Sequence, residues 1–125
     1  MVNMSLPVRI FEPRSTLERI ADNFAFLNSY VKKAEEAKND LVERMKNVIM
    51  ATLIGMMCSP SCQKPFNPYL GETFEATYKD GSKIYLEHVK HSPPISMFLV
   101  YTPGGTRISG YFEQTANLGT NKMTL

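Results

Sequence analysis

The sequence contains little of what marks several other classes of protein. Its 125 residues include only two cysteines and carry a formal net charge of +2. Two cysteines do not make a disulfide framework, and so small a charge does not indicate a nucleic-acid partner. No apolar run approaches the ~20 residues of a membrane-spanning helix. The opening residues also lack the charged and apolar regions of a secretory signal, which favours a cytoplasmic protein.

The residues that are present suit one folded domain. Hydrophobic residues make up 43% of the chain and charged residues 21%, a balance that is typical of globular proteins rather than disordered ones. A chain of this length is long enough to bury a core. We therefore predict a single structural unit spanning residues 1–125.

Residues 15–57 show the hydrophobic spacing of helices. Ser15 and Glu18 form a capping-box pattern, and apolar residues follow at helical intervals. Asn28 and Ser29 are predicted to end this first helix. Residues 30–38 are rich in Lys, Glu and Ala, which indicates a short and mostly solvated helix.

A longer helix is predicted to begin after Asn39 and Asp40, two residues that cap helices well. Its apolar residues fall on one stripe at helical spacing. We expect this stripe to pack into the core rather than to hold a cofactor. It comprises Leu41, Met45, Val48, Ile49, Leu53 and Met56.

After a proline-rich stretch at residues 58–68 the hydrophobic period changes from helical spacing to two. Strands are predicted at 73–78, 84–89, 95–101 and 107–114, with a fifth beginning at 122–125. Asp80 and Gly81 supply the turn of the first hairpin. The predicted fold class is therefore α+β, with N-terminal helices at 15–57 and an antiparallel meander at 73–125 that forms part of a barrel. Because the pattern stops within a strand, we expect the natural domain to continue.

Polar and cationic residues gather at the ends of the predicted strands. Lys64, Lys90 and His91 are suited to meet a phosphate, since both residue types donate hydrogen bonds to anions. Asn67 and Ser92 can bind hydroxyls or phosphate oxygens. The first two strands run antiparallel, so we predict that Lys64 and His91 meet at one end of the sheet. The same residues are also typical of turns and of a solvated rim, and both readings stay open here.

Two other kinds of site are weaker candidates. Cys58 and Cys62 could bind a metal only if His88 and His91 completed the set, because a closed zinc site needs four ligands. Glu72 and Glu87 resemble a carboxylate pair for acid–base chemistry, but no nucleophile accompanies them. We expect Glu72 to tie down its loop through hydrogen bonds. The sequence thus predicts no metal, no cofactor and no enzymatic activity.

Four segments resemble the oxysterol-binding-protein-related family. Residues 64–75 read KPFNPYLGETFE, close to a signature of that family, and residues 87–94 read EHVKHSPP, similar to its fingerprint EQVSHHPP. Residues 40–45 read DLVERM, which resembles the family's DPVERM. The fourth segment is the entry, which reads LPV at 6–8 and FEPRS at 11–15. The segments occur in the family's order, from about Leu6 to the last predicted strands.

This resemblance implies a large, incomplete antiparallel barrel around an apolar tunnel, preceded by helices and closed by an N-terminal lid. It implies binding and intermembrane transfer of a sterol or glycerophospholipid, with recognition of phosphatidylinositol 4-phosphate at the tunnel mouth. Lys64 and Asn67 would contact the headgroup, and His91 would grip its phosphate. The sequence departs from the fingerprint at three places: Ser92 replaces the second histidine, His88 replaces Gln, and Lys90 replaces Ser.

By this resemblance, residues 1–125 are the N-terminal portion of a lipid-binding domain. The expected partners are a sterol or phospholipid ligand, a phosphoinositide and, transiently, a membrane surface or contact site. Ser92 is expected to take part in the headgroup site, with Lys90 and His88 as accessory residues. An alternative is a truncated or degenerate fragment without transfer activity, acting as an interaction module or inactive. Ser92 and the missing strands favour that alternative.

Overall fold

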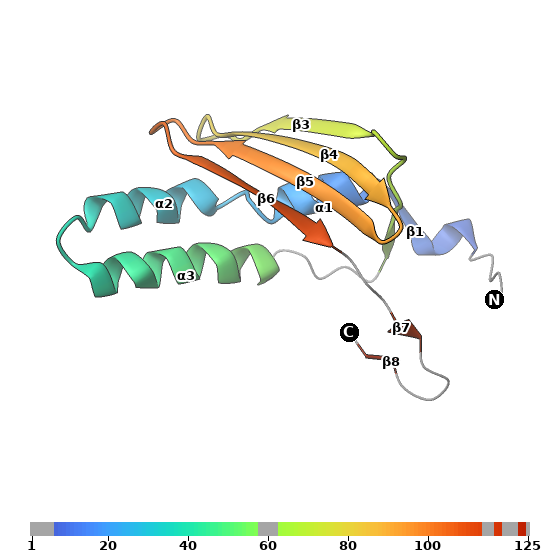
Figure 1. Ribbon diagram of the computed structural model, residues 1–125, viewed down its shortest axis with the longest axis horizontal. Coiled ribbons are helices and arrows are strands. Elements are labelled where there is room, and N and C mark those ends of the chain that lie inside the picture. Colours follow the sequence, from blue (N-terminus) through green and yellow to red (C-terminus); the bar gives the residue numbers. More distant parts are fainter. Residues whose placement is uncertain (1–6, 58–62, 114–116, 119–122, 125) are drawn as a thin grey trace.

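The protein is an α+β fold in which helices lie against one side of an antiparallel sheet, as the sequence predicts (Figure 1). The computed structural model describes residues 7–57, 63–113, 117–118 and 123–124, with side chains for 7–55 and 63–113. In chain order the elements are a short 3₁₀ helix (Val8–Ile10), β1 (Phe11–Ser15), α1 (Thr16–Asp22), α2 (Leu27–Glu36), α3 (Leu41–Met57), β2 (Lys64–Phe66), β3 (Thr73–Thr77), β4 (Lys83–His91), β5 (Pro94–Tyr101), β6 (Arg107–Glu113), β7 (Asn117–Leu118) and β8 (Met123–Thr124).

Strands β3, β4, β5 and β6 form a meander in sequence order, with every neighbouring pair antiparallel. The predicted hairpin turn at Asp80 and Gly81 joins β3 to β4, and Gly81 has the positive φ of 85° that such turns require. β1 and β2 form a separate parallel pair, and β7 pairs with β8. In the described part of the chain the strands do not close into a barrel. Residues 114, 122 and 125 of the predicted strands lie outside the described residues.

The predicted helix caps are confirmed. The Ser15 hydroxyl accepts from the Leu17 N–H at 3.1 Å, and the Glu18 carboxylate accepts from the Ser15 N–H at 3.5 Å. At the start of α3, one carboxylate oxygen of Asp40 accepts from two backbone N–H groups, each at 3.0 Å. These short-range bonds satisfy donors that a helix leaves free at its first turn, which is why a local pattern was enough to predict them.

The predicted end of the first helix is wrong. α1 ends at Asp22, and α2 begins at Leu27 and runs through Asn28 and Ser29. Between the two helices the backbone bonds are of the tighter i to i+3 kind, including Phe24 N–H to Ala21 O at 3.0 Å. The apolar spacing continues across this break because Phe24 and Leu27 pack against the core from the turn and from the start of α2.

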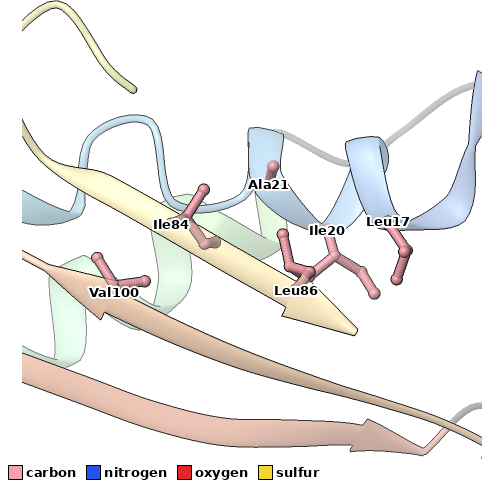
Figure 2. Close-up of a cluster of buried hydrophobic side chains, with 6 residues drawn as sticks. All are labelled: Leu17, Ile20, Ala21, Ile84, Leu86 and Val100. Carbon is pink, nitrogen blue, oxygen red and sulfur yellow. The ribbon is translucent and has the colours of Figure 1, made fainter. Parts of the chain in front are cut away.

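The core lies between α1 and the inner face of the sheet. Figure 2 shows side chains of the helix pointing toward those of β4 and β5; the cluster is Leu17, Ile20, Ala21, Ile84, Leu86 and Val100. Burial of each large aliphatic side chain contributes about 2 kcal/mol. The Tyr78 hydroxyl donates to the Ala21 carbonyl at 2.5 Å, and burial raises the pKa of this hydroxyl. The helix is thereby bound to the sheet by one directional contact as well as by apolar packing.

Three aromatic rings extend the core toward the end of the sheet. Phe24 lies 4.7 Å from Phe98, and Phe98 lies 5.3 Å from Phe112, measured between ring centroids. Phe98 faces Gly110 across the β5–β6 ladder. A Cβ atom at Gly110 would lie 2.8 Å from the Phe98 ring, so only glycine leaves room for that ring.

The prediction that the apolar stripe of α3 packs in the core is wrong for the part that the structure describes. α3 lies antiparallel beside α2 (Figure 1), and its large apolar side chains are mostly exposed, from 41% at Met50 to 75% at Leu41. The exposed set is Leu41, Val42, Met45, Val48, Ile49, Met50 and Leu53. The spacing correctly indicated one apolar face, but it carried no information on what covers that face. No helix in the described ranges combines the length and apolar character needed to span a bilayer.

A charged cluster attaches β1 to α1. The Arg19 guanidinium donates twice to the buried carboxylate of Glu12, and Arg14 donates to Asp22 at 2.8 and 3.0 Å. Two parallel bonds of this kind fix direction as well as distance. The hydrogen bonds from Arg19 lower the pKa of the Glu12 carboxyl below its ordinary value of 4.5.

We predict that Glu12→Gln destabilises the protein at neutral pH and makes its stability less dependent on pH. A carboxyl whose pKa is lowered by folding stabilises the folded state above its unfolded pKa, near 4.5, and the contribution disappears as pH falls through the folded value. Urea unfolding of both proteins from pH 7 to pH 3 should show the largest difference at pH 7. Glu75→Gln, on the exposed face of β3, is the matched control. A difference that is constant across this range would contradict the prediction.

Candidate functional site

Lys64 is held at the edge of the fold by the pairing of β2 with β1. Phe11 and Lys64 are register partners in this parallel pair, and the Lys64 ammonium lies 5.5 Å from the centroid of the Phe11 ring. Phe66 stacks on Phe11 with 4.9 Å between ring centroids, and the Thr16 hydroxyl donates to the Phe66 carbonyl at 3.1 Å. β2 is therefore fixed both to β1 and to the start of α1, and Lys64 is presented over an aromatic face.

The signature loop after β2 is fastened to β4. The Gly71 N–H donates to the His88 carbonyl at 2.8 Å, and the His88 N–H donates to the Glu72 carbonyl at 2.9 Å. The Glu72 side chain accepts from the Tyr69 N–H at 2.9 Å, which confirms the predicted role of Glu72 in tying down the loop. Glu87 lies on the opposite face of the sheet, so no carboxylate pair forms.

A β-bulge near the end of β4 decides which side chains reach the site. His88 is opposite Ser96 in the β4–β5 ladder, but Lys90 is already opposite Ile95, so Val89 is the extra residue. In a regular strand, residues three apart point to opposite faces. The bulge reverses this for His88 and His91, which both turn toward the inner side and lie with their rings 5.7 Å apart. Lys90 is exposed and shares the outer face with Ile95.

Lys64, Asn67 and His91 line one open hollow, which we call the outer depression. The predicted meeting of Lys64 and His91 at one end of the sheet is thereby confirmed as geometry. Apolar and aromatic side chains complete the lining; they are Phe11, Phe66, Pro68, Tyr69 and Leu70. Within the described part of the chain, no carboxylate lines this depression. Its electrostatics therefore suit an anion.

Behind the outer depression lies a smaller space of about 130 Å³, the histidine cavity. Asn67, Pro68 and His91 line both spaces. The other residues that line the histidine cavity are Thr16, His88, Pro94, Ser96 and Phe112. His88 is only 1% exposed and contacts Ser96 and His91 through its two ring nitrogens. The sequence had suggested His88 only as an accessory residue.

A third space, the apolar cavity, lies between α3 and the inner face of the sheet. It has a volume of about 340 Å³ and shares Phe112 with the histidine cavity. Its lining is mostly apolar and comprises Asn23, Phe24, Leu27, Ala51, Thr52, Gly55, Phe98, Ile108, Tyr111 and Phe112. A cationic mouth, a polar neck and an apolar interior thus follow one another through shared lining residues.

Other predicted site residues lie apart from these spaces. Ser92 is exposed in the turn after β4, next to a cis bond with Pro93, and lines none of the three spaces. Cys58 and Cys62 lie outside the described residues. Among the side chains that the structure describes, no group of three or more His, Cys, Asp or Glu residues could hold a metal ion.

Comparison with known proteins identifies the family. The family model for the oxysterol-binding protein matches residues 1–124 of this chain. The chain belongs to the oxysterol-binding protein family. Oxysterol-binding protein 9 of Dictyostelium discoideum is 41% identical over 117 residues, which cover 93% of this chain and 27% of that protein. Human oxysterol-binding protein-related protein 6 is 37% identical over 97 residues, covering 74% of this chain and 10% of that protein. The chain thus spans about a quarter or less of the length of these relatives.

Solved structures of the family share the fold. The Osh1 ORD domain in complex with cholesterol is 34% identical and superposes with a TM-score of 0.66, covering 82% of this chain and 25% of that one. The Osh3 ORD of Saccharomyces cerevisiae in complex with PI(4)P gives a TM-score of 0.75 at 22% identity, covering 98% of this chain and 33% of that one. The likeness to Osh3 concerns the fold alone.

We predict that Gly71→Ala costs about 1 kcal/mol of stability through the backbone alone. Gly71 has a φ of 79°, where a side chain is strained, yet a Cβ atom there would meet no heavy atom within 4 Å. Gly104→Ala is a matched control, because φ at Gly104 is outside this region and a Cβ there would make ordinary contacts, with Glu35 at 3.4 Å and Thr102 at 3.9 Å. Urea unfolding measures both. Equal stability of the Gly71→Ala protein and the wild type would show that the loop is not held in this conformation.

Proposed function

We propose that this chain binds a membrane lipid with an anionic headgroup and takes part in its transfer between membranes, without catalysing a reaction. The observation that carries the proposal is the set of three neighbouring spaces, which share lining residues and differ in character from a cationic depression to an apolar cavity. A lipid with an anionic headgroup matches this order, because its charge lies at one end and its hydrocarbon at the other. Ligand sites in proteins generally combine an apolar lining with a few placed polar groups.

The outer depression is the proposed seat of the headgroup phosphate. Lys64 supplies an ammonium with three donors, which lies over the Phe11 ring. His91 supplies an imidazole to the same hollow, and Asn67 supplies an amide. Hydrogen bonds between ionised partners are roughly twice as strong as neutral ones, so these contacts select the lipid. Phosphatidylinositol 4-phosphate fits this chemistry.

The apolar cavity is the proposed seat for part of the lipid's hydrocarbon. Its rings and aliphatic chains, above all Phe98, Ile108 and Phe112, offer no charge to a tail. Removing a tail from water contributes about 25 cal/mol for each Å² of apolar surface that is buried. The Osh1 domain, solved with cholesterol and also with ergosterol, supports a sterol as one cargo. A glycerophospholipid is the other class that the family resemblance implies.

The rim of the outer depression fits a transient contact with a membrane surface. Tyr69 is 82% exposed and Leu70 is 67% exposed, and Lys64 lies in the same hollow. An aromatic ring and an aliphatic side chain beside a cation suit the boundary between headgroups and acyl chains. The proposal therefore places the chain in the cytoplasm and, transiently, at membranes or membrane contact sites.

A second candidate function is an interaction module that does not transfer lipid. The exposed apolar face of α3 favours it, since apolar patches of this kind commonly mark surfaces that bind partners. The two candidates differ in one measurable respect. A transfer protein moves a lipid from donor to acceptor vesicles, whereas an interaction module does not.

We predict that Lys64→Ala and His91→Ala each weaken binding to phosphatidylcholine vesicles that contain phosphatidylinositol 4-phosphate. Loss of one charge-assisted contact corresponds to about a tenfold loss of affinity. Because both groups would contact one phosphate, the double variant should lose less than the sum of the two free-energy changes. Vesicle flotation at several lipid fractions gives the affinities.

Lys83→Ala is the matched control for this series. Lys83 is an exposed lysine on the same strand as His91, but at the opposite end. It removes one positive charge without touching the outer depression, so it reveals any loss that comes from net charge alone. Unchanged flotation of both alanine variants would overturn the headgroup assignment.

We predict that Ala51→Phe slows the transfer of a fluorescent sterol between vesicles, because the larger ring fills part of the apolar cavity. Met50→Phe is the control, as Met50 precedes Ala51 on α3 but does not line the cavity. Circular dichroism should confirm that both variants fold. If the wild-type chain moves no sterol and no phospholipid between vesicles, the transfer function is wrong and the interaction module is the better candidate.

A further inference from the structure

Three polar side chains form a hydrogen-bonded series that ends at the outer depression. Ser96 Oγ lies 3.0 Å from His88 Nδ1, and His88 Nε2 lies 3.4 Å from His91 Nδ1. The two imidazole rings are nearly perpendicular, at 89°. His88 is buried, whereas His91 reaches the outer depression. With its Nδ1 turned toward His88, His91 has only Nε2 left to meet a ligand.

Two arrangements of the protons satisfy these contacts, because the Ser96 hydroxyl can either accept or donate. In one of them His88 donates from Nε2 to Nδ1 of His91 and accepts from Ser96. A neutral imidazole carries one N–H donor and one acceptor nitrogen, so one of the two facing nitrogens must donate and the other accept. If His91 donates from Nδ1, His88 accepts at Nε2 and donates from its own Nδ1 to the Ser96 hydroxyl. This arrangement also suits a His91 protonated on both nitrogens, since its Nδ1 keeps the same acceptor.

The burial of His88 decides which of the two rings meets a ligand. His88 is 1% exposed and has contacts at both ring nitrogens, whereas His91 lines the outer depression. The two histidines are the titratable residues that line the histidine cavity, and Lys64 and Tyr69 line the outer depression together with His91. No carboxylate among the described residues belongs to either lining.

We propose that His88 is a positioning residue of the anion site. It accepts the Nδ1–H of His91, which turns Nε2 of His91 toward the outer depression. When a phosphate group binds there, Nε2 takes up one proton from solvent and donates it in a hydrogen bond to a phosphate oxygen. The anion thus meets the Nε2–H of His91 and the ammonium of Lys64, and His88 supports His91 from behind. This inference rests on the proposed lipid-binding function.

The same geometry lets His88 support His91 in a chain that has serine, rather than a second histidine, at position 92. A residue at position 88 can act on His91 only because the bulge at Val89 places both side chains on one face. In the family fingerprint this position is Gln, whose amide oxygen is also an acceptor, so an acceptor beside His91 is the property in common. His88 adds the Ser96 hydroxyl behind it, and the series leaves the buried ring with both nitrogens paired.

The first test needs no ligand. In nitrogen-15 NMR of the histidine side chains at pH 8, both His88 and His91 should carry their proton on Nδ1, whereas free histidine prefers Nε2. His88→Leu removes the acceptor, so His91 should revert to the Nε2–H form. His88→Gln keeps an acceptor, so His91 should retain Nδ1–H. An Nε2–H form of His91 in the wild type, or no change in His88→Leu, would overturn the inference.

The second test uses the vesicles with phosphatidylinositol 4-phosphate. His88→Leu should weaken binding about tenfold, and His88→Gln should recover most of that loss. Calorimetry in buffers of different ionisation heat should show uptake of about one proton by the wild type and less by His88→Leu. A variant that merely disturbs folding would also fail in the glutamine form. Wild-type chain that shows both Nδ1–H forms yet binds no phosphoinositide would support the histidine pair and overturn the proposed function instead.

Discussion

The candidate site depends on one residue of β4 that is held from two directions. The backbone of His88 donates to and accepts from the loop that carries the family signature, through Glu72 and Gly71. Its side chain contacts His91 at the mouth. Loop and strand end would otherwise be separate surface segments, each free to move. Because both are bound to His88, and His88 is buried against the cavity behind them, the amide of Asn67 and the imidazole of His91 occupy fixed positions around one hollow.

Most of the fold is predictable where the decisive forces are local. The cap at Ser15, the cap at Asp40 and the turn at Gly81 each depend on residues within a few positions of one another. The change from helical to alternating spacing likewise reflects which face of each element is buried. The break between α1 and α2 escaped prediction because Phe24 packs on Phe98 and Phe112 from a turn, so the apolar spacing never lapses.

The site was predictable only in part, for a related reason. Antiparallel pairing alone places Lys64 and His91 at the same end of the sheet, and the structure has them there. The relation of His88 to His91 was not predictable, since the bulge at Val89 inserts one residue against the partner strand and reverses the alternation. Nothing in the letters around Val89 marks a bulge. Lys90 was predicted to be an accessory residue of the headgroup site, but the register places it on the outer face.

α3 shows that an apolar face on a helix does not reveal which surface, if any, packs against it. Its Ala51, Thr52 and Gly55 are small residues that face the sheet across the apolar cavity, while its large residues, such as Leu41 and Ile49, are exposed. Small side chains on one side keep a space open, and large ones on the other present a continuous apolar surface. A helix built only to fill a core would have the reverse arrangement, with its bulk toward the sheet. Under the proposed function, the small residues opposite Phe98 and Phe112 leave the space in which the hydrocarbon of a lipid would lie, next to the histidines that would meet its headgroup.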